Sequence, residues 1–132
     1  MGWYVKVMRA DGGELGTRES VQERIAAHFA GTVFTEEPAG PQKVADLEKR
    51  NGFELPEALR SLFAKMPVTY VGDFGRERDS LWIHFHLGSR DSLRMLTAEI
   101  KGDLDTAEQM LGRLCAANEW VLSEYSPADE NG

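Results

Sequence analysis

The sequence predicts an α+β fold: a ferredoxin-like antiparallel sheet with two covering helices and an inserted helical hairpin. Two patterns carry this prediction. Apolar and polar residues alternate along residues 81–87 and again along 96–101, the period of two that half-buried strands show. Apolar residues then recur at helical spacing over residues 104–115, and residues 120–125 return as a strand. This order of strand, strand, helix and strand is typical of a sheet with helices packed on one face.

The N-terminal part repeats the same scheme. Residues 3–8 alternate as a strand, and a helix follows that begins at Thr17 or Ser20, because either hydroxyl can cap it; Ser20 is the better candidate since an acidic residue lies three positions later. The buried stripe of this helix is expected to be Val21, Ile25 and Phe29. Residues 32–35 are β-branched enough to form a short strand.

The later helix is expected to begin at Asp105, with Glu108 three residues on completing a variant of the capping box. The side chains that share its apolar stripe are Leu104, Ala107, Leu111, Leu114 and Cys115. Cys115 is the only cysteine, so it forms no internal disulfide, and we expect a buried structural thiol in a cytoplasmic protein.

The amino-acid composition changes in the middle of the chain. Residues 36–41 are acidic and rich in Pro and Gly, which predicts a linker, and two short amphipathic helices follow up to residue 67. We therefore expect a single α+β domain over residues 1–126 with an inserted hairpin at 36–67. Residues 68–72 are β-rich and predict an edge strand, residues 73–80 a charged loop, and residues 127–132 a disordered acidic tail.

Composition narrows the classes of function. The chain has 132 residues, with 22 acidic against 15 basic ones and a formal net charge of −7. This balance disfavours a general nucleic-acid binder, which needs phosphate-neutralising Lys and Arg, and it suits a basic protein partner. No apolar run is long enough to cross a bilayer, so we expect no membrane association.

Catalytic motifs are lacking. No serine lies in a Gly-x-Ser-x-Gly context, and no phosphate-binding loop of the Gly-x4-Gly-Lys-Ser/Thr type occurs. We therefore expect a protein that is not an enzyme and needs no cofactor.

Two histidines mark one face of the predicted sheet. His84 and His86 are two residues apart on a strand and so project from the same side, where Glu99 of the neighbouring strand could supply a third ligand. Imidazole with carboxylate is a plausible zinc set, which would make the protein a metal-dependent enzyme or a metal sensor. The alternative is a sheet face with two incidental histidines and no metal, and this is the interpretation we adopt.

Trp82 is expected on the same face as these histidines. Two interpretations remain open: the hairpin folds over the face and buries Trp82, or the face is left for a partner. The residues expected to form a partner-binding surface are Glu36, Glu37, Asp73, Trp82, His84 and His86.

The hairpin resembles a segment of the SMI1/KNR4 superfamily, in which a helix, a glycine, a Leu-Pro pair and a second helix follow one another. The matching residues are Leu47, Glu48, Gly52, Leu55, Pro56, Leu59 and Phe63. That superfamily is rich in immunity proteins. The resemblance therefore implies a small acidic cytoplasmic binding protein, specifically an immunity protein that neutralises a cognate bacterial toxin with a basic domain.

The terminal parts of the chain resemble a set of small uncharacterised bacterial α+β proteins. The matching residues are Trp3, Gly16, Thr17, Arg18, His86, Leu87, Gly88, Gly102, Asp103, Leu114, Cys115 and Trp120. This resemblance implies a fold and no established activity. A homodimer formed through the open sheet face is a further alternative.

Overall fold

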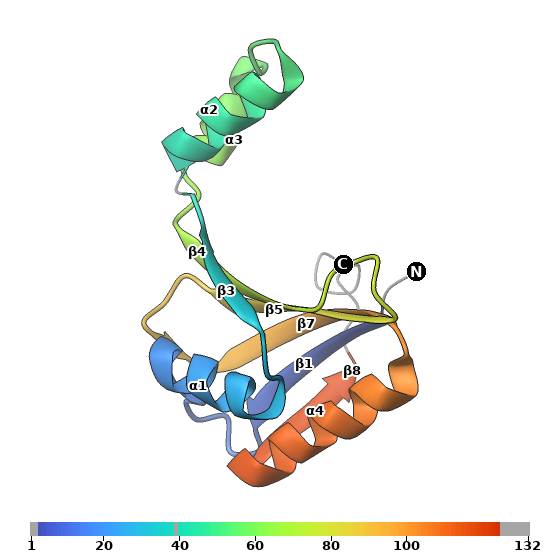
Figure 1. Ribbon diagram of the computed structural model, residues 1–132. Coiled ribbons are helices and arrows are strands. Elements are labelled where there is room, and N and C mark those ends of the chain that lie inside the picture. Colours follow the sequence, from blue (N-terminus) through green and yellow to red (C-terminus); the bar gives the residue numbers. More distant parts are fainter. Residues whose placement is uncertain (1–2, 39, 125–132) are drawn as a thin grey trace.

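The computed structural model describes residues 3–38 and 40–124, and it confirms the α+β class. Six strands form one antiparallel sheet in the order β3-β4-β5-β7-β1-β8 (Figure 1). Their bounds are β1 Trp3–Arg9, β3 Val33–Glu37, β4 Thr69–Phe74, β5 Leu81–Gly88, β7 Met95–Gly102 and β8 Trp120–Glu124. Two short strands, β2 Gly16–Thr17 and β6 Ser92–Leu93, pair separately.

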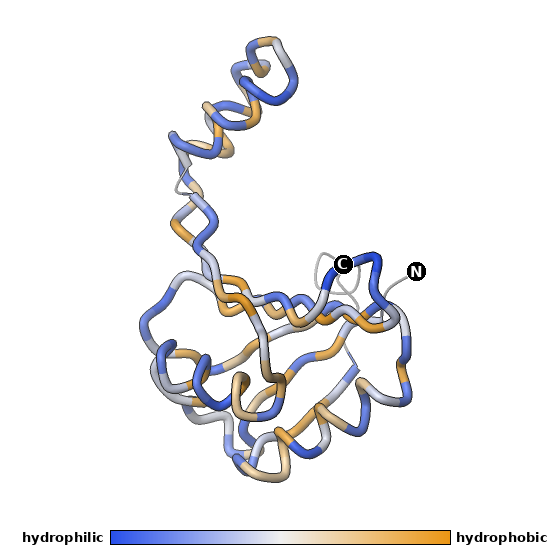
Figure 2. Tube along the Cα trace, viewed as in Figure 1, coloured by the Kyte–Doolittle hydropathy of each residue, from blue (hydrophilic) through white to orange (hydrophobic). Residues whose placement is uncertain are grey.

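Two helices cover one face of the six-stranded sheet: α1 spans Arg18–His28 and α4 spans Leu104–Asn118. The core lies between them and the sheet. Figure 2 shows apolar segments gathered there. The largest fully buried side chains are Phe29, Phe85, Ile25, Ile83, Leu87, Leu96, Ile100, Leu111, Leu114, Val5, Val7 and Val21.

The alternation predicted for the central strands is confirmed. Ile83 and Phe85 of β5 are fully buried, and they lie opposite Ile100 and Ala98 of β7 in the antiparallel register. Because side chains on a strand point to opposite faces in turn, this register leaves Trp82, His84 and His86 on the face away from α1 and α4.

Both helix starts differ in part from the expected ones. Thr17, not Ser20, caps α1 by accepting a hydrogen bond from the Ser20 amide. Asp103, not Asp105, caps α4 by accepting from the Thr106 amide, because Gly102 ends β7 and the helix begins at once. Leu104 therefore lies in the first turn and is 46% exposed, so its assignment to the buried stripe was wrong.

The outer part of the sheet also differs. β3 extends to Glu37, and the pairing of Glu37 with Thr69 places it in the sheet and not in a linker. β4 is an inner strand between β3 and β5, so the predicted edge position is wrong and β3 is the edge. β4 also runs on to Phe74, because Phe74 packs edge-on against Phe29 of the core. Asp73 thus belongs to a strand and not to a loop.

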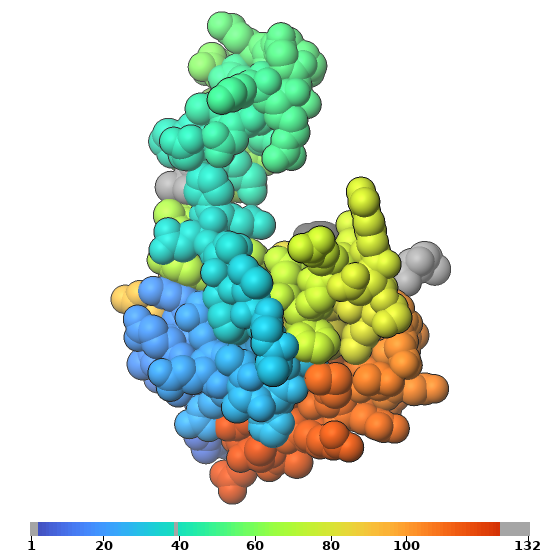
Figure 3. All heavy atoms as spheres, viewed as in Figure 1, coloured from blue at the N-terminus to red at the C-terminus, as the bar shows by residue number. Residues whose placement is uncertain are grey.

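Two helices follow β3, α2 at Gly40–Asn51 and α3 at Glu57–Ala64, and we call residues 40–66 the arm. Gly40 lies so close to the carbonyl oxygens of Phe63 and Ala64 that a side chain there would clash. The Gly40 amide donates to the Met66 carbonyl at 2.8 Å and closes the base of the arm. Figures 1 and 3 show the arm projecting away from the sheet, so it does not fold over the face of β5. Trp82 on that strand is half-buried.

Residues 127–132, expected to form a disordered tail, lie outside the described residues. Among the residues described, no helix is both long and apolar enough to cross a membrane.

Candidate functional site

The open face is the side of the sheet opposite α1 and α4. Its side chains come from all six strands, because the antiparallel register aligns the outward positions of neighbouring strands. The residues that form its centre are Tyr4, Asp73, Trp82, His84, His86, Thr97, Glu99 and Lys101. The face is polar and aromatic, in contrast to the apolar face beneath the helices.

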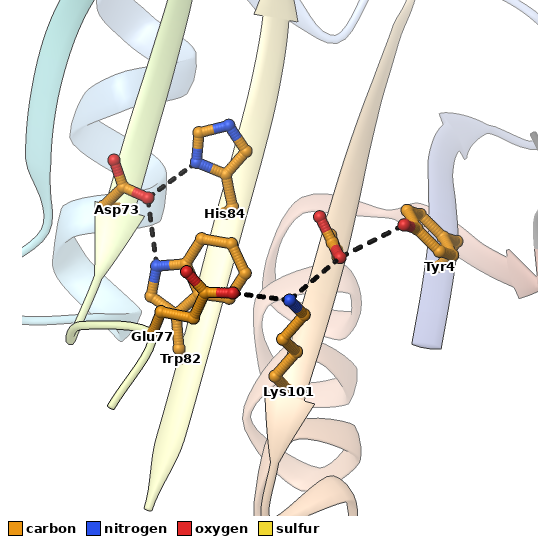
Figure 4. Close-up of polar contacts among 7 residues, drawn as sticks. Tyr4, Asp73, Glu77, Trp82, His84 and Lys101 are labelled. Carbon is orange, nitrogen blue, oxygen red and sulfur yellow. Dashed lines mark hydrogen bonds and ion pairs between the residues drawn. The ribbon is translucent and has the colours of Figure 1, made fainter. Parts of the chain in front are cut away.

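A three-residue cluster orders the centre of this face. Asp73 of β4 lies directly opposite His84 of β5 in the register. One carboxylate oxygen, Oδ1, lies 3.1 Å from Nε1 of Trp82 and 2.6 Å from Nδ1 of His84 (Figure 4). A carboxylate only accepts hydrogen bonds, so both ring nitrogens that contact Oδ1 are donors. Nδ1 of His84 therefore carries a proton. The cluster therefore fixes both rings and leaves Nε2 of His84 directed away from Asp73.

The aromatic rings of β5 are packed in a row. The Trp82 and His84 rings stack with centroids 5.5 Å apart and planes at 21°. The His84 and His86 rings meet edge to face at 4.4 Å. The Lys101 ammonium lies 5.4 Å from the Trp82 ring centroid, within the range of a cation–π contact. The row is held from both sides and presents an ordered aromatic surface.

A chain of polar contacts continues from Trp82 to the far side of the face. Lys101 binds Glu77 of the β4–β5 loop at 2.6 Å and lies 3.8 Å from Glu99. Glu99 in turn accepts a hydrogen bond from the Tyr4 hydroxyl at 3.1 Å. The hydrogen bond to Glu99 raises the pKa of Tyr4, and the bond between Lys101 and Glu77 raises the pKa of Lys101 and lowers that of Glu77. These pKa shifts favour the neutral Tyr4 hydroxyl, the charged Lys101 ammonium and the charged Glu77 carboxylate.

His86 differs from His84 in its surroundings. Its side chain is exposed, but desolvation against its neighbours, and then the nearby His84 ring, lower the pKa of His86 below 6.5. It also lines a hollow of about 350 Å³ between the sheet and the base of the arm. The other residues that line this hollow are Glu37, Pro38, Lys43, Met66, Pro67, Thr69, Tyr70 and Gly88.

Five of the six residues predicted for a partner surface share the open face. Trp82, His84 and His86 lie in the row on β5, and Asp73 holds two of them. Glu37 lies at the neighbouring strand end, bonded to Thr69 and near Lys43. Glu36 is the exception: it alternates with Glu37 and shares the face of Phe34, which packs against the core. The structure therefore does not bring Glu36 together with the other five residues.

The hypothesis of a zinc site required Glu99 beside the two histidines. Glu99 does lie opposite His84 in the register, but its carboxylate is engaged by Tyr4 and Lys101. Within residues 3–38 and 40–124, no three His, Cys, Asp or Glu side chains are arranged to hold a metal ion. The geometry therefore favours a structural network over a ligand set.

Sequence reasoning missed the role of Glu77. It belongs to the loop between β4 and β5, where no periodicity indicates which way a side chain points. Only its charge, opposite to that of Lys101, could have suggested the pair.

Comparisons of this chain with protein-family models, with curated proteins and with solved structures each returned no match. The site must therefore be interpreted from its own chemistry.

Proposed function

We propose that this protein is a binding protein whose open face recognises a protein partner. The observation that carries the proposal is the ordered row of Trp82, His84 and His86 on a face that α1 and α4 leave uncovered. Asp73 fixes the first two rings by hydrogen bonds. Aromatic side chains dominate the energetics of protein interfaces. Side chains already held by hydrogen bonds lose less conformational freedom when a partner binds, so more of the contact energy appears as affinity.

Charge supports a basic partner. The arm has five basic and four acidic residues, so the rest of the chain has ten basic and eighteen acidic ones and carries the whole excess of negative charge. Complementary charge speeds the encounter of two proteins and disfavours partners of the wrong sign. Together with the resemblance of the arm to part of the SMI1/KNR4 superfamily, this supports the specific proposal of an immunity protein that neutralises a basic toxin domain.

We further propose a ferredoxin-like arrangement for the part of the fold that presents this face. In chain order β1, α1, β5, β7, α4 and β8 alternate as strand, helix, strand, strand, helix, strand, and the strands lie side by side as β5-β7-β1-β8. On this interpretation β3, the arm and β4 are an insertion between α1 and β5, which enlarges the open face on one side.

Co-expression tests the proposal. A toxin domain encoded beside this gene should arrest growth, and this protein should restore it; failure of every neighbouring gene product to be neutralised would contradict the immunity proposal. With the purified pair, Trp82→Ala should weaken binding at least about 30-fold, the size of an interface hot spot. Gln109→Ala, exposed on α4 behind the sheet, is the matched control and should bind normally.

Zinc titration tests the alternative. We expect no stoichiometric Zn²⁺ or Co²⁺ binding that depends on the histidines. Stoichiometric binding that His84→Ala/His86→Ala abolishes would favour a metal site instead.

A further inference from the structure

The arm leaves much of its own apolar surface uncovered. Leu59 is 41% exposed, Leu62 57% and Met66 36%, and no residue of α3 is buried. Figure 3 shows that the arm stands clear of α1, α4 and the centre of the sheet, so these parts of the body do not cover its apolar side chains.

Helices this short need such cover. α2 has 12 residues and α3 has 8, and helices of these lengths are marginal in water unless an apolar face is packed. Within the arm, α2 contributes Gly40 and Val44 as buried residues. The pairing of α2 with α3 therefore uses one side of α3 and leaves a second apolar side free.

The spacing of the free side is symmetric. Its apolar residues are Leu55, Leu59, Leu62 and Met66, separated by four, three and four positions. This series is the same in both chain directions, with its centre between residues 60 and 61. An antiparallel second copy therefore places Leu59 against the copy's Leu62 and Leu55 against the copy's Met66. Leu59 and Leu62 lie within α3, whereas Leu55 precedes its N-cap, Pro56, and Met66 follows its C-cap, Lys65, so the segments that flank the helix make the two outer contacts.

Charges along the same segment favour the same orientation. Glu54 and Glu57 lie at its start and Lys65 lies near its end, whereas Arg60 lies beside the centre and pairs with Glu48 of its own arm at 3.8 Å. Antiparallel pairing brings the acidic start of one copy to the basic end of the other, whereas parallel pairing would align like charges. The segment is thus complementary to itself about a two-fold axis, as an isologous dimer interface requires.

We propose that residues 55–66 form an antiparallel two-fold contact with a second copy of this chain, giving a homodimer joined through its arms. The chain's own open face is a poorer cover, because its side chains are satisfied by one another and an apolar helix would desolvate them. A stable interface buries about 800 Å² on each partner. A contact built on one short helix is smaller, so we expect a dissociation constant on the order of 10–100 µM.

Sedimentation equilibrium of the whole protein tests this. The wild type should pass from monomer to dimer with a dissociation constant on the order of 10–100 µM. Leu62→Glu should raise that constant at least about tenfold, because a buried carboxylate would lie at the centre of the contact. Ser61→Glu adds the same charge next to it, in the same turn but off the stripe, and should leave dimerisation within about threefold.

Two further measurements separate a lost contact from a lost fold. Leu62→Met preserves apolar volume and should preserve the dimer. The far-ultraviolet circular dichroism of Leu62→Glu should match that of the wild-type monomer, because α2 and α3 contribute helical signal that would be lost if the arm unfolded. A wild type that stays monomeric, or a dimer equally strong in Leu62→Glu, would overturn the proposal; the latter would place the interface elsewhere, including on the open face.

Discussion

The body of the molecule, which is the sheet with α1 and α4, buries its apolar side chains far more completely than the arm does. In the body, a sheet and two helices enclose fully buried side chains such as Ile83, Phe85 and Leu111. In the arm, two helices of comparable apolar content bury only Gly40 and Val44 among their own residues. Because burial of apolar surface is the main source of stability, the body holds the fold, and the arm is free to serve contacts outside it.

The largest expected difference comes from truncating the core. Phe85→Ala removes a fully buried ring that packs edge-on against Phe29, and it should lower the free energy of unfolding by about 3–5 kcal/mol. Leu62→Ala in the arm should lower it by less than about 0.5 kcal/mol, because that side chain is largely exposed. Urea denaturation of both variants below the dimer range measures the contrast. Equal losses would mean that arm and body are one cooperative unit.

A smaller effect is expected from the polar cluster. Asp73→Ala removes the acceptor shared by Trp82 and His84 and should cost about 1 kcal/mol. It should also let His84 place its proton on Nε2, which nitrogen chemical shifts of the ring report. Asp46→Ala, which removes an acceptor of Gln42 on the arm, is the matched control. We expect it to change neither quantity.

The pH dependence of stability should be weaker still. The folded-state pKa of His86 lies below 6.5, so the native state favours its neutral form. The unfolded state therefore binds a proton at His86 more readily than the native state does. Above pH 6.5 this costs no stability, and the free energy of unfolding falls as the pH drops through 6.5 and below the lower folded pKa. The unfolding free energy of the wild type minus that of His86→Gln should therefore fall as the pH is lowered over this range. If this signed difference rises on acidification, the lowered pKa of His86 is contradicted.

Removing the arm should have the smallest effect. The Gly40 amide and the Met66 carbonyl are hydrogen-bonded, so a short Gly-Ser turn can replace residues 41–65 without separating β3 from β4. The midpoint of thermal unfolding should stay within about 2 °C of the wild-type monomer, because no body core residue is removed. A large fall would show that the arm stabilises the sheet.

The fold was most predictable where one physical preference dominated. Strict alternation at Ile83 and Phe85 placed β5, since one face of that strand is buried and the other is not. Helix starts were less predictable, because Asp103 and Asp105 are chemically equal candidates. The choice between them depends on where β7 ends.

The sequence predicted the sheet face on which the site residues lie, but not the hydrogen bonds between them. Period-two alternation placed Trp82, His84 and His86 on one face, as the structure has them. The partner that orders them, Asp73, was expected in a loop because the sequence around it is charged and contains glycine. Its strand is specified by pairing with β3 and β5 and by the contact of Phe74 with Phe29, all distant in sequence. The direction of the arm depends on that same long-range pairing.

The closed base of the arm also makes the protein a natural scaffold. The pairing of Glu37 with Thr69 and the hydrogen bond between Gly40 and Met66 hold the two ends of this 27-residue segment together at the tip of a strand pair. Any module whose own ends lie equally close could be grafted there, a fluorescent reporter or a foreign hairpin among them. Because His86 lines the hollow at the base of the arm, such a graft would sit next to this end of the open face and could be designed to report its occupancy.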